Sequence, residues 1–345
     1  MSQLPILLLD GGLGTSLEDQ YGVRFDSSTP LWSSHLLISD PETLYRGRKD
    51  FSDVLVDILS TPTYQISIEG FARTRTDEFP DGIRGEKVKQ YLDAALRMCE
   101  DATRGSQTEI ALSLGPYGAC MVPSQEYSGA YDAEHSSVDQ LQAWHLQRLR
   151  LFMEQNDLLT RIGYIAFETI PRADEIIAIR RAVEESGIVS GSQAPKVWIS
   201  CVFPNENALL PDGSTIPSIF ENLTSKERSS FVPWGIGINC TKIDKLQVLV
   251  NELEENIPPS ASRGLSLVLY PDGTNGEVYN TTTQMWELPP GPRPERRSWE
   301  TQLADIVRQV DLRGNWASIV VGGCCKATPE DIRRLRHAIS NPRDF

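Results

Sequence analysis

Three of the six cysteines in this 345-residue chain stand where they could bind a metal ion. Cys240 ends the apolar run GIGINC, and Cys324 and Cys325 directly follow the run SIVVGG. Thiolates are soft ligands that suit zinc, and three of them would leave the fourth tetrahedral position open, as a catalytic zinc site requires. Neighbouring side chains of a strand point to opposite faces, but Gly322 and Gly323 would allow the backbone to turn both sulfurs toward one ion. The alternative interpretation is three free cysteines that are buried as small apolar groups.

The other cysteines and the histidines show no comparable arrangement. Cys99 lies in a helical stretch, Cys120 in a loop and Cys201 inside an apolar run, so we interpret all three as structural. The four histidines have no spacing typical of metal ligation or of a catalytic triad. We therefore predict no catalytic residue beyond the metal site. Six cysteines are too few for a disulfide framework in a chain of this length, and we expect free thiols.

Two carboxylates and a pair of glycines also follow apolar runs. Asp10 and Glu168 would be buried acids that need a partner, which either a substrate ammonium group or an arginine such as Arg172 could supply. Gly11 and Gly12 permit a close backbone approach. Their N–H groups could receive a substrate carboxylate, or the pair could form no more than a tight turn.

One tryptophan stands in the polar loop TPLWSS. The face of the Trp32 indole could hold a cationic sulfonium group by cation–π attraction. Alternatively, the ring could anchor the loop on the rim of the fold. The sequence leaves both interpretations open.

Eight short apolar runs are expected to be the strands that position these residues. Most are continuous rather than alternating, which is typical of strands buried on both faces of a parallel sheet. The runs are residues 6–9, 54–59, 110–114, 164–167, 197–203, 235–238, 265–269 and 318–321. Stretches with helical spacing separate them, at residues 85–103, 137–160, 173–185, 242–255 and 299–310, with further helix starts at residues 40–42 and 328–330.

This alternation indicates an α/β protein built as a single (β/α)8 TIM barrel over residues 1–345. A doubly wound open sheet is the alternative, but it usually has fewer strands, and no G-x-G-x-x-G motif follows the first run. Barrel active sites are built from the loops after the strands, which is where the polar and thiol residues above lie. Two long loops, residues 73–85 and the proline-rich residues 287–297, are additions to this pattern.

The net charge of −14 argues against nucleic acid or an anionic membrane surface as a partner. The first residues lack the basic start and the long apolar run of a secretory signal, and no run has the length of a membrane span. We therefore expect a cytoplasmic protein that acts on small molecules. None of these features predicts the oligomeric state.

The motifs together resemble those of the homocysteine S-methyltransferase family over nearly the whole chain. The resemblance rests on LLLDGGLGTSLE, TPLWSS, STPTYQ, FETIP, GINC, and GGCC followed by TPEDI. The pair GINC and GGCC at this separation is the most specific element, while the others stand in the right order. Lys326 after the double cysteine and the loop at residues 272–274 depart from the usual pattern, but neither changes a cysteine.

The resemblance implies an enzyme that contains Zn²⁺ and has Cys240, Cys324 and Cys325 as metal ligands. Its activity would be the transfer of a methyl group from a sulfonium donor, S-methylmethionine or S-adenosylmethionine, to the thiol of L-homocysteine, giving methionine. The resemblance also implies that two carboxylates bind the homocysteine amino group, that two glycines approach its carboxylate, and that two aromatic rings lie near the donor methyl. The substrate-binding residues expected in this way are Asp10, Gly11, Gly12, Trp32, Thr63, Tyr64, Glu168 and Asn239.

Other functions are compatible with the same residues. Selenocysteine or another thiol could replace homocysteine as the acceptor. A non-catalytic zinc- or redox-sensing barrel protein is the alternative of a different class, but it would need a fourth protein ligand, and no further cysteine or histidine ends a predicted strand. A barrel lyase with a hard metal at Asp10 and Glu168 is a third possibility.

Overall fold

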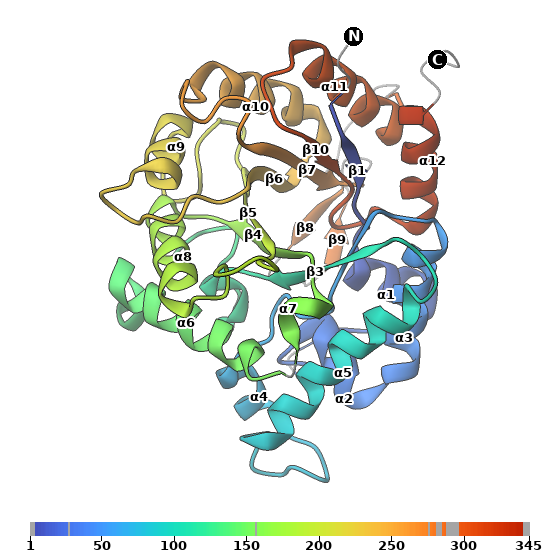
Figure 1. Ribbon diagram of the computed structural model, residues 1–345. Helices are drawn as coiled ribbons and strands as arrows, with labels where there is room; N and C mark the ends of the chain where they lie inside the picture. Colours follow the sequence, from blue (N-terminus) through green and yellow to red (C-terminus); the bar gives the residue numbers. More distant parts are fainter. Residues whose placement is uncertain are drawn as a thin grey trace.

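Eight parallel strands form a closed barrel in the computed structural model of the chain, as predicted (Figure 1). The structure describes residues 4–26, 28–155, 157–274, 277–280, 285–287 and 297–340. The sheet order is β1-β10-β7-β6-β5-β4-β3-β2, and a parallel bridge between Leu9 and Ile58 joins its two ends. The strands are β1 (Ile6–Leu8), β2 (Ile58–Ser60), β3 (Glu109–Leu114), β4 (Tyr164–Ile170), β5 (Lys196–Cys201), β6 (Gly235–Lys242), β7 (Ser266–Asp272) and β10 (Ile319–Val321).

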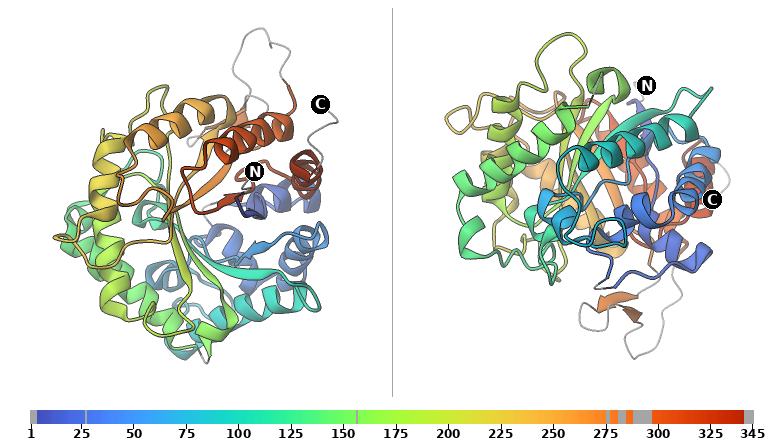
Figure 2. Two further views of the ribbon diagram at one scale, coloured as in Figure 1. Left: turned by 45° about the horizontal axis from the view of Figure 1, so that its top comes forward. Right: turned by 90° about the horizontal axis from the view of Figure 1, so that it is seen from below.

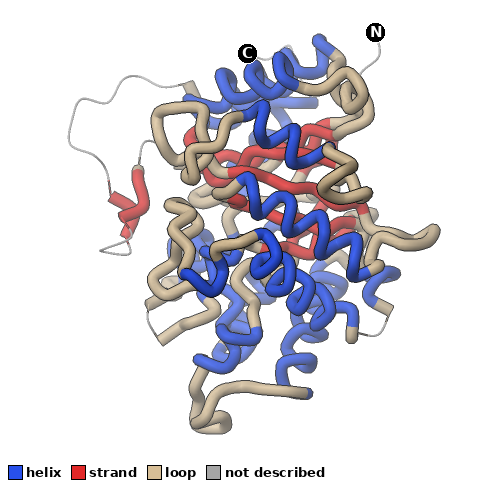
Figure 3. Tube along the Cα trace, turned by 90° about the vertical axis from the view of Figure 1, so that its left-hand side faces the viewer, coloured by secondary structure: helices blue, strands red, loops and turns tan. Residues whose placement is uncertain are grey.

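Helices surround the barrel and cover the outer face of its strands (Figures 1 and 2). They are α1 (Leu13–Tyr21), α2 (Leu36–Ser39), α3 (Pro41–Asp53), α4 (Ile68–Arg73), α5 (Glu86–Ala102), α6 (Val138–Met153), α7 (Leu158–Arg161), α8 (Ala173–Ser186), α9 (Ile216–Thr224), α10 (Ile243–Asn256), α11 (Trp299–Arg313) and α12 (Pro329–Ser340). The loops contain the short 3-10 helices η1 (Trp32–His35), η2 (Tyr117–Cys120) and η3 (Ala133–His135). An antiparallel hairpin stands apart from the barrel (Figures 2 and 3); its strands are β8 (Val278–Asn280) and β9 (Met285–Glu287).

Capping side chains determine where several helices begin. The Asp40 carboxylate accepts a hydrogen bond from the Thr43 N–H, and Pro41 occupies the first turn of α3. Ser137 and Gln140 form a reciprocal capping box at the start of α6. Both caps satisfy N–H groups that have no partner within the helix, which is why these predicted helix starts are confirmed.

Several elements have other bounds than the sequence predicted, and two of these differences are the largest. The apolar run 54–59 predicts a strand throughout, but β2 begins only at Ile58 because α3 continues to Asp53 and a turn follows. Leu55 lies in that turn with a left-handed φ of 60° and is exposed, so it does not belong to the barrel. The helix predicted over residues 137–160 is two helices, α6 and α7.

The strands bury side chains in two separate layers. Trp198 and Tyr270 are large members of the barrel interior, where Trp198 Nε1 donates a hydrogen bond to the Tyr270 hydroxyl over 3.3 Å. In β7, Val268 and Tyr270 face this interior, whereas Leu267 and Leu269 belong to the larger core between strands and helices. Because both faces are apolar, the strands have the continuous apolar sequences that predicted a parallel sheet.

The structure describes, to different extents, the two long loops that the sequence predicted. Residues 74–85 contain no helix or strand, in agreement with the predicted loop. The other predicted loop, residues 287–297, lies outside the described residues except at its two ends. Among the described helices, none is both long and apolar enough to span a bilayer.

Candidate active site

Four side chains that can bind a metal ion converge at the carboxyl ends of neighbouring strands. Cys240 lies near the end of β6, Asp272 ends β7, and Cys324 and Cys325 follow β10. One donor atom from each residue lies within 4.8 Å of the other three. The barrel therefore brings the three predicted cysteines together. It adds the Asp272 carboxylate, which sequence reasoning missed as a ligand, because only the closed barrel shows that the end of β7 lies beside the sulfurs.

Two of these cysteines lie in direct contact through their sulfur atoms. The Cα atoms of Cys240 and Cys324 are 5.4 Å apart, and the other four cysteines are free. The expectation of free thiols stays a prediction for the Cys240 and Cys324 pair. The closure of the barrel causes their contact, because β6 and β10 flank β7 and deliver two thiols from distant parts of the chain to one point. A disulfide and a metal ion would use the same sulfur atoms, so metal binding requires the reduced pair.

Backbone hydrogen bonds hold the double-cysteine loop against the end of β7. The Cys324 N–H donates to the carbonyl oxygen of Pro271, and the Gly273 N–H donates to that of Cys325, both over 2.8 Å. These two bonds flank Asp272 and fix its carboxylate beside the sulfurs.

The glycine pair after β1 provides space for the same loop. A Cβ on Gly12 would clash with the carbonyl oxygen of Cys324, and one on Gly11 would clash with that of Ala327. The Gly12 N–H already donates to Ala327 O over 3.0 Å. Both glycines line the cavity described below. The Gly12 N–H is engaged by Ala327, and the approach of this backbone to a substrate carboxylate stays a prediction.

Asn239 holds the end of β6 in position. Its side-chain oxygen accepts a hydrogen bond from the Thr169 N–H, and its amide donates to the Thr169 hydroxyl, both over 2.8 Å. The amide also points toward Cys324 Sγ at 3.9 Å. Asn239 is fully buried and is not among the residues that line the cavity, so we interpret it as a positioning residue rather than as the predicted substrate contact.

The backbone around the cysteine cluster contains several strained residues. Thr169 and Cys240 have left-handed φ angles of 62° and 46°, and Trp32 and Lys326 have angles of 47° and 63°. Such conformations cost residues other than glycine free energy, and they persist where the surrounding structure imposes them. Their concentration around the cysteine cluster marks this end of the barrel as the functional one.

Asp272 and Cys325 share surroundings that disfavour negative charge. Burial raises the pKa of the Asp272 carboxyl to about 7, and Lys242 offsets part of this effect. Burial, and next the charge of Asp272, raise the pKa of the Cys325 thiol well above its usual value. Asp272 Oδ1 is also buried without a hydrogen-bond partner. A cation between the two groups would favour the charged form of both, so the donor set and its electrostatics fit a metal ion such as zinc.

Asp10 is paired with a buried arginine that sequence reasoning missed. Arg48 Nη1 lies 2.6 Å from Asp10 Oδ2, and both side chains are almost fully buried. The Ser60 N–H and hydroxyl also donate to the Asp10 carboxylate, at 3.0 and 2.9 Å. The arginine considered from the sequence, Arg172, pairs with Asp174 instead. Because Arg48 offsets the charge of Asp10, this carboxylate alone is a weak partner for a substrate ammonium group.

Glu168 lines the same cavity as Asp10 and accepts a hydrogen bond from the Ser113 hydroxyl. Burial raises the pKa of the Glu168 carboxyl to about 7; the charge of Asp10 adds to this increase, while Ser113 and Arg48 oppose it. When both carboxylates are ionised, this group of side chains carries one more negative than positive charge. A bound ammonium group would balance it.

A cavity of about 560 Å³ connects these carboxylates with the cysteine cluster. Its wall includes Phe25, Trp32 and Tyr64, whose ring centroids are 5.6 Å apart for the first pair and 6.4 Å apart for the second. The two aromatic residues predicted from the sequence therefore lie in one cavity with the sulfurs. Thr63 does not line this cavity: it is fully buried, and its hydroxyl donates to Ser113 O over 2.7 Å.

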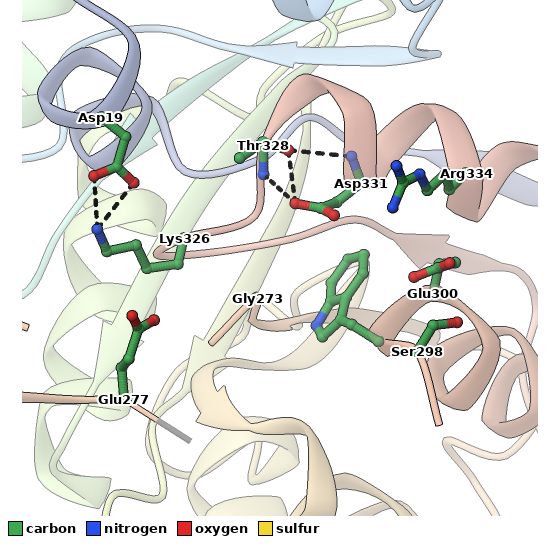
Figure 4. A pocket seen from close by; sticks show the side chains of 10 residues that line it. Asp19, Gly273, Glu277, Ser298, Glu300, Lys326, Thr328, Asp331 and Arg334 are labelled. Carbon is green, nitrogen blue, oxygen red and sulfur yellow. Dashed lines mark hydrogen bonds and ion pairs between the residues drawn. The ribbon is translucent and has the colours of Figure 1, made fainter. Parts of the chain in front are cut away.

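A second cavity, of about 460 Å³, lies between α1, α11 and the start of α12 (Figure 4). Two of its charged side chains have partners in the protein. Lys326 forms an ion pair with Asp19, and the Asp331 carboxylate accepts hydrogen bonds from Thr328. No cysteine lines it. We therefore assign the chemistry to the larger cavity.

The fold and the site together define a barrel enzyme. At the carboxyl end of its strands it has a thiol-rich cluster of side chains that can bind a metal ion. Residues 7–339 match the family model for homocysteine S-methyltransferase. The chain is 28% identical over 337 residues to homocysteine S-methyltransferase 1 of Brassica oleracea var. italica, which covers 95% of this chain and 91% of the relative. It is also 28% identical over 333 residues to homocysteine S-methyltransferase of Escherichia coli strain K12, which covers 96% and 94%.

A solved structure supports the fold. The metallated form of the homocysteine methyltransferase MmuM from Escherichia coli aligns with a TM-score of 0.69 at 24% identity, covering 96% of both chains. The chain belongs to the homocysteine S-methyltransferase family and is a methyltransferase. The resemblance seen in the sequence is thus confirmed, and the enzyme interpretation is favoured over a non-catalytic sensor.

Replacing Gly12 with alanine is expected to weaken metal binding while the barrel stays folded. The new Cβ would clash with the Cys324 carbonyl oxygen, so the double-cysteine loop must move. We expect the zinc affinity, measured by chelator competition under reducing conditions, to fall roughly tenfold or more, as for other losses of support around metal ligands. G264A is the matched control because a Cβ at Gly264 has room. Equal affinities of G12A and the unmodified protein would contradict this role of Gly12.

Removing the Asp272 carboxylate is expected to weaken zinc binding to a similar extent. In D272A one of the four clustered donors is lost, whereas the hydrogen bond from Trp299 to the backbone carbonyl of residue 272 can remain. The same competition assay should show a fall of roughly 10- to 100-fold. D77A is the control, because Asp77 is exposed and is not part of the cluster. An unchanged affinity would mean that only the sulfurs bind the ion.

Proposed function

We propose that the chain transfers a methyl group from a sulfonium donor, S-methylmethionine or S-adenosylmethionine, to the thiol of L-homocysteine, giving methionine, and that it requires zinc. The observation that carries this proposal is a cluster of three cysteine sulfurs, with one carboxylate beside them, whose cysteines line a cavity that also has aromatic rings in its wall. The match to the family model over residues 7–339 supports the acceptor and the view that the barrel is one catalytic domain.

The proposed zinc ligands are Cys240, Cys324 and Cys325, with Asp272 as a further donor. When bound, zinc supplies positive charge that lowers the pKa of a substrate thiol, so that the acceptor is a thiolate at neutral pH. The backbone hydrogen bonds between the double-cysteine loop and the end of β7 hold the sulfurs in position. This arrangement leaves the protein with the task of aligning the acceptor sulfur and the donor methyl group.

Glu168 is the proposed main contact for the ammonium group of homocysteine, with Asp10 as its neighbour. Arg48 already forms an ion pair with Asp10, so Glu168 is the carboxylate whose negative charge a substrate ammonium group can balance. Both groups line the cavity that contains the sulfurs. An amino acid bound through its ammonium group here would extend its thiol toward the cysteine cluster.

The aromatic wall formed by Trp32, Tyr64 and Phe25 is the proposed contact for the donor sulfonium. A sulfonium group has no N–H to donate, so the faces of aromatic rings are suitable partners for its charge. In the reaction the acceptor sulfur forms a bond to the methyl carbon as the bond from that carbon to the donor sulfur breaks. The donor leaves as a neutral thioether, and the thiol proton passes to solvent, so no acid on the protein needs to protonate the leaving group.

Replacing any one of Cys240, Cys324 and Cys325 with alanine should abolish zinc retention and turnover. Each variant loses a ligand that the remaining donors cannot replace in tetrahedral geometry. Zinc per chain and methionine formed from homocysteine and S-methylmethionine are the measurements. C201A is the control, because Cys201 ends β5 but packs in the core between strands and helices and is not part of the cluster. A cysteine variant that keeps both zinc and activity would exclude that residue as a ligand.

The KM for homocysteine should rise as the pH falls through about 7. The pKa of Glu168 is raised to about 7, so its carboxyl is charged above that pH and neutral below it, and only the charged form attracts an ammonium group. We expect KM to rise up to roughly tenfold over one pH unit below the pKa. In E168Q the KM should be high and should change little over the same range. A pH dependence that persists unchanged in E168Q would assign the titration to another group.

A further inference from the structure

Glu126 is a buried carboxylate that the proposed chemistry has not used. It lies in the loop after β3, lines the large cavity and is only 8% exposed. The loop is held on both sides by backbone hydrogen bonds, from Gln125 N–H to Gly118 O and from Gly129 N–H to Gln125 O, both 2.8 Å. The carboxylate is therefore kept at a fixed position in the cavity wall.

One oxygen of this carboxylate has no partner in the protein. The Glu126 backbone N–H and the Ser124 side chain donate to the carboxylate, but Oε2 is buried without a hydrogen bond. Burial raises the pKa of the Glu126 carboxyl to about 7. A buried acceptor without a donor destabilises the folded protein, and a cationic hydrogen-bond donor is the ligand that would remove this cost.

Glu126 stands beside the aromatic wall. Burial is the main cause that raises the pKa of the Tyr64 hydroxyl well above its usual value, and the charge of Glu126 is the next. Tyr64 in turn makes an edge contact with Trp32. The proposed sulfonium contact and an unsatisfied carboxylate oxygen are thus neighbours in one cavity.

Besides Asp10 and Glu168, the cavity has Glu126 as a buried carboxylate on another element, and the proposed reaction has two amino-acid substrates. Asp10 and Glu168 stand at strand ends and are suited to the ammonium group of homocysteine. Glu126 stands on a different element, and an ammonium group can donate to its free oxygen, which a sulfonium group cannot do. Each substrate would then have its own carboxylate.

We propose that Glu126 binds the α-ammonium group of an amino-acid sulfonium donor and thereby selects donors that carry an amino group. This inference rests on the proposed function, because it assumes that the cavity accepts a sulfonium. S-methylmethionine and S-adenosylmethionine have such an ammonium group, whereas betaine-type donors do not. Glu126 is accordingly a residue for donor specificity and not for the acceptor.

The test compares the binding of two donors to two proteins by calorimetry, which needs no turnover. The donors are S-methylmethionine and its desamino analogue, (3-carboxypropyl)dimethylsulfonium, and the proteins are the unmodified zinc-loaded enzyme and E126Q. The unmodified enzyme should prefer S-methylmethionine by roughly tenfold or more, the difference expected for a charge-assisted hydrogen bond. E126Q should bind the two donors within about threefold of each other. E134Q is the matched control, because Glu134 is exposed and does not line the cavity.

The outcomes separate this inference from the proposed function. A preference that E126Q retains, or an E126Q variant that loses affinity for both donors equally, would overturn the role of Glu126 in binding the ammonium group. Weaker homocysteine binding in E126Q with unchanged donor binding would also overturn it. If S-methylmethionine binds in a way that depends on Glu126 but no methionine forms, the proposed reaction is contradicted and the inference about Glu126 stands. Binding of homocysteine and the thermal unfolding temperature should match in E126Q and E134Q, which shows that the variant is folded.

Discussion

The site depends on the parallel hydrogen bonding of β6, β7 and β10. The register pairs Ile238 with Leu269 and Leu269 with Val321, so these residues of the three strands lie at one level. Cys240 follows two residues later within β6, and the double cysteine follows shortly after β10, so thiols that are far apart in the sequence reach one point. The bonds between the double-cysteine loop and the end of β7 complete that arrangement, and the glycines after β1 leave the space that it occupies.

A second constraint is the charge of the cavity and of the cysteine cluster beside it. The carboxyls of Glu126, Glu168 and Asp272 all have pKa values raised to about 7 by burial, while the buried Arg48 is already paired with Asp10. The carboxylates that line the cavity outnumber its two arginines, Arg48 and Arg73. The proposed ligands provide positive charge at separate places: a zinc ion at the cysteines, an ammonium group at each glutamate and a sulfonium at the aromatic wall. The negative charge is therefore part of how substrates are recognised.

The sequence predicted the elements that follow from local pattern, and it missed contacts that depend on the closed barrel. Continuous apolar runs predicted the parallel strands because both strand faces are buried. Arg48 was missed although it lies between Leu44 and Phe51 on the buried face of α3, where a charged residue at helical spacing signals a buried partner. The partner of the Gly12 N–H could not be predicted, because it depends on which loops meet after the barrel closes.

The zinc content of the purified, reduced protein, measured together with its activity, tests the central claim most directly. Zinc per chain is determined first, and the formation of methionine from homocysteine and S-methylmethionine is then followed by mass. The account predicts about one zinc per chain and methionine formation that stops when a chelator removes the metal. Methionine formation by metal-free protein, or a reduced protein that does not retain zinc, would contradict the account.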